Sequence, residues 1–278
     1  MTSTRRSDID LAVIGGSGFT ALHDDVEVVE VTTPWGPPSG PIQVAEVDGR
    51  AVAFLPRHGE GHRFPAHRVP FRANLWALRE LGVTRVLGPC ASGSLHSDVH
   101  PGDLVVVDQA VDHTWGRDST FFDGPTVNHV SLADPYCPQL RSTLLAAAED
   151  GPLPVHDGGT VTVIQGPRFA TRAESRLHRQ QGGTIINMTQ MPEAALAREL
   201  GLCYASASLV TDYDTGVEDD PDVSPVTQSQ VFAFFEANLP KLHDVLLAAL
   251  AAIPADRTCG CADAPGGLVP DPPTHEPT

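Results

Sequence analysis

Two aspartates behind an apolar segment have the residue type and the spacing that acid–base chemistry needs. Asp212 and Asp214 follow the apolar run that ends at Val210. Side chains two residues apart lie on the same side of an extended chain, so both carboxyls can point into one pocket. A buried carboxyl beside another one can keep its proton at neutral pH. The alternative is that both residues belong to a solvated loop.

Residues that can hold an anion occur at three other places in the chain. Ser17 lies in a glycine-rich turn, where backbone N–H groups and a hydroxyl can converge on phosphate. Arg57 offers a planar fork that matches phosphate oxygens, and His58 can donate a further hydrogen bond. Thr189 precedes a predicted helix, where its hydroxyl either caps the helix or holds phosphate. Taken singly, these residues also fit a tight turn, a surface loop and a helix cap.

Small and aromatic side chains follow two further apolar segments. Residues 88–94 are small and follow a predicted strand, which predicts a backbone that approaches a ligand or another backbone closely. Cys90 in this run is interpreted as a small buried filler rather than a nucleophile. Phe169 can stack on a purine base or pack in the core.

Metal ligands are considered at two places. His62 and His67 lack the spacing of a zinc site, so no metal is expected there. Cys259 and Cys261 are one residue apart in an acidic tail rich in proline and glycine. Two such thiols can pair with each other, bind a soft metal, or do neither.

The order of the motifs along the chain is more specific than any one of them. The motifs are Ile14-Gly15-Gly16-Ser17-Gly18, Arg57-His58-Gly59, Ala73-Asn74-Leu75-Trp76-Ala77-Leu78, Gly166-Pro167-Arg168-Phe169 with Arg172-Ala173-Glu174-Ser175, Asn187-Met188-Thr189 with Pro192-Glu193, and Thr211-Asp212-Tyr213-Asp214. This series resembles the methylthioadenosine phosphorylases, which belong to the trimeric branch of the purine nucleoside phosphorylase family. The resemblance extends from about residue 11 to about residue 253.

The resemblance implies a fold and a reaction. The fold would be a single α/β domain with a central mixed β-sheet flanked by helices, assembled as a homotrimer with active sites at subunit interfaces. The reaction would be phosphate-dependent cleavage of the N-glycosidic bond of 6-aminopurine nucleosides. S-methyl-5′-thioadenosine would give adenine and 5-methylthioribose 1-phosphate. Inorganic phosphate would be a co-substrate, and no metal or organic cofactor would be needed.

The resemblance also implies a role for individual residues. Phosphate would be bound by Ser17, Arg57, His58, Thr189 and the backbone at Ala91; the base by Phe169, Asp212 and Asp214; the ribose by Met188; and the 5′ group by Gln228 and by His129 from a neighbouring subunit. Asp212 would be the general acid at N7 of the base.

The hydrogen-bonding edge of the base distinguishes 6-amino from 6-oxopurine substrates. Adenine presents an acceptor beside an amino donor, whereas 6-oxopurines present two acceptors, which a carboxylate repels. The 6-oxopurine branch carries an asparagine at the position of Asp212, so a 6-aminopurine is favoured.

Cys90 stands where the family usually has a threonine that touches phosphate. The alternatives are a broader phosphorylase of adenosine or inosine, distinguished by the polarity around Gln228, and a nucleoside-binding protein without catalysis.

The elements that must position these residues alternate along the chain. Apolar runs predict strands over 11–14, 42–47, 52–55, 84–87, 104–107, 160–164, 184–186 and 204–210, and helical spacing predicts helices over 70–81, 191–200 and 228–252. Alternating strands and helices predict an α/β domain with a mixed or largely parallel sheet. We expect the phosphorylase domain to span residues 8–253, followed by a disordered acidic tail over 254–278.

Charge and composition exclude several classes of partner. The 278 residues include 35 acidic and 18 basic ones, which give a formal net charge of −17. Such a surface repels a polyanion, so nucleic acid is not an expected partner. No apolar run approaches the roughly 20 residues of a membrane span, and the start of the chain is no signal peptide. A cytoplasmic protein without a membrane partner is therefore expected, and five cysteines do not suggest a secreted disulfide framework.

Overall fold

The first strand shows why helices cover both faces of the sheet. In this computed structural model, which describes residues 8–16, 26–216 and 224–273, the strand β1 (Ile9–Gly15) is almost fully buried. Ala12 and Ile14 join the core formed with helices α1 (Phe71–Leu81) and α4 (Gln190–Glu199). Leu11 and Val13 join the core formed with α2 (Pro138–Glu149) and α5 (Gln228–Ala252). Because strand side chains alternate, one apolar strand supports a helix pair on each side.

The described strands form two sheets. The first has six strands in the order β12 (Cys203–Ala205), β5 (Arg85–Leu87), β1, β4 (Arg50–Pro56), β3 (Ile42–Val47) and β2 (Glu27–Val29). The second has seven, in the order β8 (Gln109–His113), β10 (Thr160–Ile164), β11 (Ile185–Asn187), β6 (Cys90–Ser94), β13 (Ser208–Asp212), β7 (Leu104–Val106) and β9 (Val155–Asp157). Both sheets contain parallel and antiparallel pairs.

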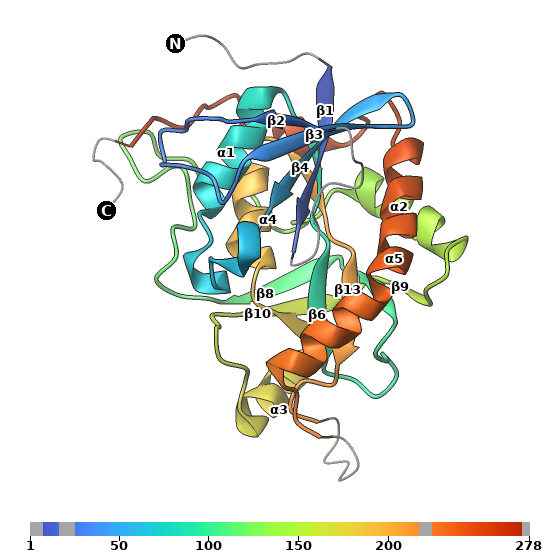
Figure 1. Ribbon diagram of the computed structural model, residues 1–278. Coiled ribbons are helices and arrows are strands. Elements are labelled where there is room, and N and C mark those ends of the chain that lie inside the picture. The colour runs from blue at the N-terminus through green and yellow to red at the C-terminus, as the bar shows by residue number, and fades with distance from the viewer. Residues whose placement is uncertain (1–7, 17–25, 217–223, 274–278) are drawn as a thin grey trace.

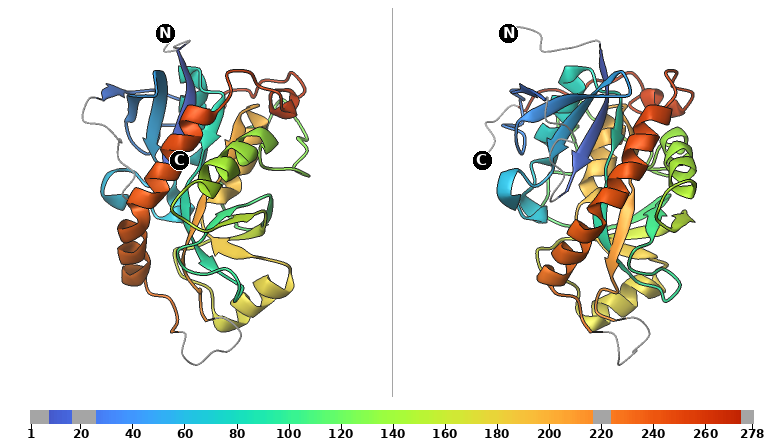
Figure 2. Two further views of the ribbon diagram at one scale, coloured as in Figure 1. Left: turned by 90° about the vertical axis from the view of Figure 1, so that its right-hand side faces the viewer. Right: turned by 45° about the vertical axis from the view of Figure 1, so that its right-hand side comes forward.

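The chain passes from the first sheet directly into the second at two places, and it returns to the first sheet between them through helix α4. It runs from β5 into β6, and again from β12 into β13, with two residues between the strands each time. Figure 1 shows α5 crossing in front of the second sheet, and Figure 2 shows α2 beside α5 on that side. Helix α3 (Arg172–Gln180) lies at the far end of the second sheet, and short 3₁₀ helices span Glu60–His62, Ala66–Arg68 and Gly260–Asp263.

The prediction of an α/β domain with a mixed sheet flanked by helices is confirmed. The predicted bounds of α5, β3 and β10 agree with the structure. The prediction of one strand over 204–210 is wrong, because the chain bends there to change sheets, and Ser206 Oγ donates a hydrogen bond to the Gly88 carbonyl at 2.8 Å. The run of small residues over 88–94 makes the close approach to other backbone that its composition predicts. Its small residues form β6, which pairs with both β11 and β13.

The segment after α5 differs from the expected disordered tail as far as residue 273. Arg85 Nη2 donates hydrogen bonds to the carbonyls of Pro254 and Ala255 at 3.1 and 2.6 Å. Asn128 Nδ2 donates to the Pro265 carbonyl at 3.0 Å. A composition of proline, glycine and aspartate suggested disorder, but it does not reveal partners that lie more than a hundred residues away in the sequence.

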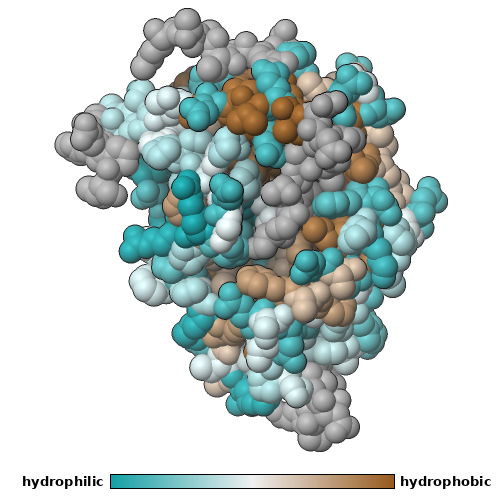
Figure 3. All heavy atoms as spheres, in the orientation of Figure 1, coloured by the Kyte–Doolittle hydropathy of each residue, from teal (hydrophilic) through white to brown (hydrophobic). Residues whose placement is uncertain are grey.

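The face of the molecule drawn in Figure 3 is largely hydrophilic. Hydrophobic residues form small groups between the hydrophilic side chains. None of the helices in the described part of the chain is long and apolar enough to cross a membrane.

Candidate functional site

A cavity of about 330 Å³ lies where the carboxyl ends of strands meet the first turns of α5. Strands β4, β10, β11 and β13 all end beside it, which is where α/β sheets bind ligands. Its volume falls within the range of small-molecule sites, roughly 300–1,000 Å³. The residues that line it are Gly16, Arg57, His58, His62, Pro65, Ala66, Cys90, Ala91, Ser92, Gly93, Ile164, Pro167, Phe169, Ile186, Asn187, Met188, Thr189, Thr211, Asp212, Asp214, Gln228, Val231, Phe232 and Phe235.

The two predicted carboxyls both line this cavity, but not because the strand stays extended. Strand β13 ends at Asp212, and the chain then turns, so that Asp214 has a left-handed backbone with φ of 52°. The Asp214 N–H donates to Asp212 Oδ1 at 2.7 Å, and Thr211 Oγ1 donates to Asp212 Oδ2 at 2.7 Å. These bonds fix the Asp212 carboxyl in place.

The surroundings of both carboxyls favour protonation. Burial raises the pKa of Asp212, although its two hydrogen bonds partly oppose the rise. Burial, together with the nearby charge of Asp212, raises the pKa of Asp214 to about 6, against a hydrogen bond from Ser175. Asp214 Oδ2 is buried and has no hydrogen-bond partner among the described residues. A buried oxygen of this kind is expected to accept a hydrogen bond from a ligand.

A glycine makes room for these carboxyls. Gly93 on β6 pairs with Asp212, and a Cβ at residue 93 would lie 2.9 Å from Asp212 Oδ1 and 3.1 Å from Ile186 Cγ2. A larger residue would push the carboxyl out of position. The run of small residues in β6 is therefore needed for close packing beside the cavity.

The guanidinium of Arg57 is mostly occupied within the protein. Its Nε and Nη2 bind both oxygens of Glu193 at 2.8 Å, and both side chains are 1% exposed. Its other hydrogen bonds go to the carbonyls of Pro89 and Ile14, each at 2.9 Å. Burial alone would lower the pKa of Arg57, but the charge and hydrogen bonds of Glu193 outweigh it and raise the pKa. Of the five N–H groups of a guanidinium, one on Nη1 remains for a ligand.

This pairing changes the interpretation of Arg57. The sequence suggested that the whole guanidinium would be available to phosphate. In the structure, its Nε and Nη2 groups bind Glu193 instead. Removing Arg57 would leave a buried carboxylate without its partner, at a cost of about 3–5 kcal/mol in stability. Thr189 is therefore the cleaner probe of an anion site.

His58 has a fixed tautomer when it is neutral. Its Nδ1 lies 2.8 Å from the Phe64 carbonyl oxygen, which can only accept, so Nδ1 carries the proton. Burial, with the charges of His62 and Arg57 adding to it, lowers the pKa of His58 to about 3. The His62 ring stacks on it at 4.1 Å between centroids. Neutral His58 thus offers the lone pair of Nε2, which can accept from a protonated phosphate oxygen but cannot donate.

Thr189 and Cys90 supply further polar atoms. Thr189 precedes α4, but its side chain makes no cap hydrogen bond, and the helix is irregular at Met191. Its hydroxyl is therefore not used as a cap. Cys90 is buried, as expected of a small filler, and its Sγ accepts hydrogen bonds from Asn187 Nδ2 and Gln190 Nε2 at 3.2 and 3.3 Å, so the thiol also belongs to a polar network.

Sequence reasoning missed an arginine that holds two walls of the cavity. Arg117 donates to the carbonyls of Met188 and Met191 at 2.9 and 2.7 Å, and to the Gln165 carbonyl at 2.7 Å. It thereby ties the segment of Met188 to the segment that leads to Phe169. Its partners are backbone oxygens and the side-chain oxygen of Gln165, which leave no motif in the sequence.

The remaining walls are largely apolar. Helix α5 contributes Val231, Phe232 and Phe235, beside the more polar Gln228. The sequence analysis singled out Gln228 but not these three neighbours, although their helical spacing of three and four residues was a usable signal.

Two predicted site residues are not among the lining residues. Ser17 lies outside the described residues, whereas its neighbour Gly16 lines the cavity. His129 is exposed and lies away from the cavity of its own chain. Nine predicted residues do line it: Arg57, His58, Ala91, Phe169, Met188, Thr189, Asp212, Asp214 and Gln228. Polar groups for an anion, paired carboxyls and an apolar wall thus meet in one cavity.

Comparisons with known proteins agree with this arrangement. Residues 10–251 match the phosphorylase superfamily. The chain is 56% identical to an S-methyl-5′-thioadenosine phosphorylase of Mycolicibacterium smegmatis, over 90% of this chain and 93% of the relative. It is 53% identical to a purine nucleoside phosphorylase of Streptomyces coelicolor, over 94% and 96%. A methylthioadenosine phosphorylase from an Antarctic soil metagenomic library superposes with a TM-score of 0.85 at 39% identity, over 93% of this chain and 91% of that one.

The raised pKa of Asp214 predicts a pH-dependent stability. Between pH 3.8 and 6 the unfolded state loses the proton before the native state does, so the native state is progressively penalised as pH rises, by up to about 3 kcal/mol above pH 6. Asp214→Asn should therefore raise the free energy of unfolding at pH 7.5 by about 1–3 kcal/mol. The gain should vanish near pH 3.5, as measured by urea unfolding at both pH values.

Asp48→Asn is the matched control, because Asp48 is exposed and has nearly the same backbone, with φ of 50°. It should change stability little at either pH. If Asp214→Asn gave no stabilisation at pH 7.5, the buried carboxyl would not be under the penalty described.

Proposed function

Since this chain belongs to the phosphorylase superfamily, we propose that it uses inorganic phosphate to cleave the N-glycosidic bond of 6-aminopurine nucleosides. The substrate is S-methyl-5′-thioadenosine, and the products are adenine and 5-methylthioribose 1-phosphate. Relatives with that name share about half of their residues with this chain over most of its length. The observation that carries the choice of base is the buried Asp214 Oδ2, which lies beside Asp212 in the cavity and has no hydrogen-bond partner within residues 8–16, 26–216 and 224–273.

The carboxyl pair suits the edge of adenine. Adenine presents an N7 acceptor next to an amino donor. In this proposal Asp214 Oδ2 accepts from the amino group, and Asp212 faces N7. A 6-oxopurine would instead place an acceptor against the carboxylate oxygen, which neither group can satisfy without a proton.

The reaction needs two forms of assistance that this cavity can give. Cleavage passes through a sugar with oxocarbenium character, which nearby negative charge stabilises. Phosphate provides that charge and attacks C1′, held by Thr189, by the remaining N–H of Arg57 and by the backbone at Ala91. Nε2 of neutral His58 accepts a hydrogen bond from the proton that the phosphate carries. Asp212, whose pKa burial raises, donates a proton or a strong hydrogen bond to N7 of the leaving base. The chemistry calls for no metal or organic cofactor.

The apolar wall distinguishes the 5′ group. Val231, Phe232 and Phe235 on α5 offer hydrocarbon surface to a methylthio group, while a 5′ hydroxyl would find few partners beyond Gln228. Met188 and Phe169 are assigned to the ribose and the base. Gly166, with φ of 64°, supports the place of Met188, because a Cβ there would lie 2.5 Å from Met188 Sδ.

We further propose a homotrimer in which His129 reaches the 5′ end of a neighbour's substrate. His129 is exposed, and the exposed hydrophobic residues Val127 and Leu132 flank it, at 65% and 42%. Apolar side chains in solvent beside a polar one are typical of a surface that another subunit covers.

The second candidate is a broader purine nucleoside phosphorylase, which is the name of the Streptomyces coelicolor relative. The unpartnered carboxylate oxygen disfavours inosine, and the α5 wall disfavours a free 5′ hydroxyl. A nucleoside-binding protein without catalysis would not need phosphate-binding groups beside C1′.

Phosphate dependence tests the reaction class. Methylthioadenosine, adenosine, inosine and guanosine should be offered with and without phosphate, and the free base measured. We expect release only with phosphate, fastest from methylthioadenosine. Thr189→Val should raise the KM for phosphate about tenfold or more, since it removes one hydrogen bond to a charged group. Thr143→Val, in which the lost hydroxyl serves only helix α2, should not. Equal release without phosphate would indicate a hydrolase and refute the proposal.

Base choice tests the role of Asp212. An amide at residue 212 can still donate to N7, but it removes a negative charge next to the Asp214 carboxyl, which faces the 6-position in this proposal. Asp212→Asn should therefore shift the ratio of kcat/KM for adenosine over inosine towards inosine by about tenfold or more. Asp98→Asn, on an exposed loop, should leave the ratio unchanged. An unchanged ratio in the Asp212 variant would mean that the charge of this residue does not contribute to the choice between 6-amino and 6-oxopurines.

Hybrid assembly tests the shared site. His129→Ala and Asp212→Ala subunits should each be strongly impaired alone. Co-expressed in equal amounts, they should regain about one quarter of wild-type activity, because about one interface in four then combines an intact Asp212 with a neighbour's intact His129. Failure to regain activity in hybrids of verified composition would contradict a site shared between subunits.

A further inference from the structure

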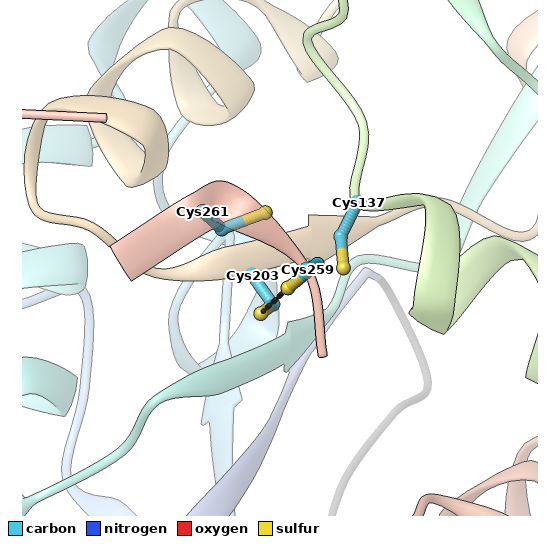
Figure 4. Close-up of side chains that lie close together, drawn as sticks. All are labelled: Cys137, Cys203, Cys259 and Cys261. Atoms are coloured by element: carbon cyan, nitrogen blue, oxygen red, sulfur yellow. Dashed lines mark hydrogen bonds between the residues drawn. The ribbon is translucent and has the colours of Figure 1, made fainter. Parts of the chain in front are cut away.

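Four of the five cysteines meet at a place outside the cavity lining. Cys137, Cys203, Cys259 and Cys261 place their sulfur atoms within 4.8 Å of one another. Figure 4 shows the four side chains converging from three separate segments. Cys137 precedes α2, Cys203 begins β12, and the other two flank the start of the 3₁₀ helix Gly260–Asp263.

The spacing suits one tetrahedral ion. A Zn–S bond of about 2.3 Å in a tetrahedron separates the sulfur atoms by about 3.8 Å. Cys203 Sγ and Cys259 Sγ lie 3.3 Å apart, and the upper bound for every pair is 4.8 Å. Small movements of side chains would therefore complete a four-thiolate site. All four cysteines are free thiols in the structure.

The surroundings are those of a closed site. Cys137, Cys203 and Cys261 are at most 2% exposed, and they belong to the core around α2 and α5. Cys259 is partly exposed, which leaves a route for an ion to enter. Structural zinc sites are of this type, with four protein ligands and no open position.

Two arginines can offset the negative charge of such a site. Arg198 Nη1 lies 3.5 Å from Cys261 Sγ. Arg257, two residues before Cys259, donates to the Gly201 carbonyl at 2.7 Å. The Nε groups of both arginines are buried without a hydrogen-bond partner among the described residues. Cations with spare N–H groups favour thiolates over thiols, and outer groups of this kind stabilise metal ligands.

We propose that these four cysteines bind one Zn²⁺ ion as a structural site. Binding releases four thiol protons and leaves four Zn–S bonds, with no oxidation or reduction. The ion would fasten the C-terminal segment to β12 and to the start of α2. Soft thiolate ligands in a tetrahedral set select zinc over the hard cations magnesium and calcium.

The test begins with the metal content of the wild-type full-length chain, purified under reducing conditions without chelator. Elemental analysis should find about one zinc per chain. Cobalt exchanged into the site should give the intense visible absorption of a tetrahedral thiolate complex. The variant Cys259→Ser/Cys261→Ser should lose the zinc, while Cys90→Ser, which removes the thiol outside the cluster, should keep it. Exhaustive chelation should lower the Tm of the wild type by about 5 °C or more and leave that of the double variant unchanged.

Several results would overturn the proposal. Wild-type protein with four free thiols and no metal would do so, as would disulfides among these cysteines found by peptide mapping under non-reducing conditions. Iron in place of zinc, or zinc retained by the double variant, would also refute it. The wild-type measurements decide the matter even if the double variant does not fold.

Discussion

The buried ion pair between Arg57 and Glu193 is the constraint on which the cavity depends. It joins the end of β4 to helix α4, and its remaining bonds reach the carbonyls of Ile14 and Pro89, at the end of β1 and between β5 and β6. Tyr204 on β12 adds a hydroxyl to Glu193 at 2.7 Å. Two charges out of water are costly unless every polar atom has a partner. Here the further partners of Arg57 are backbone carbonyls at strand ends. The ion pair therefore holds together the region where the chain passes from the first sheet to the second.

Local patterns predicted the elements that lie within one layer. The apolar runs of β3 and β10 and the long periodicity of α5 agree with the structure because each element buries one continuous set of side chains. The errors fall where the chain changes layers. Ser206 bonds to Gly88 across the two sheets, and β6 is built of small residues that have little strand propensity. The change of sheet at Ser206 and the formation of β6 both depend on partners that are distant in the sequence. A short stretch of sequence does not contain those partners.

Partners distant in the sequence also limited the prediction of the candidate site. Strand-end motifs identified most of the residues that line the cavity, since a ligand site at such ends needs glycines, hydroxyls and charges. They did not reveal that Arg57 is committed to Glu193, or that the Phe64 carbonyl sets the tautomer of His58. Arg117 was missed because it binds only main-chain and amide oxygens of distant segments. The four-cysteine cluster likewise joins residues that no single motif contains.

The left-handed backbone at Asp214 has an evolutionary consequence. Aspartate and asparagine are the non-glycine residues that adopt this conformation most readily, so the turn accepts either without strain. The codons of the two amino acids differ by a single nucleotide. A single mutation can therefore replace the carboxyl by an amide at this wall of the cavity without changing the backbone. Most other substitutions at residue 214 would also have to change the conformation of the turn. Under the proposed role of Asp214 in recognising the base, descendants of this scaffold can thus diverge in the base they accept while their folds stay superimposable.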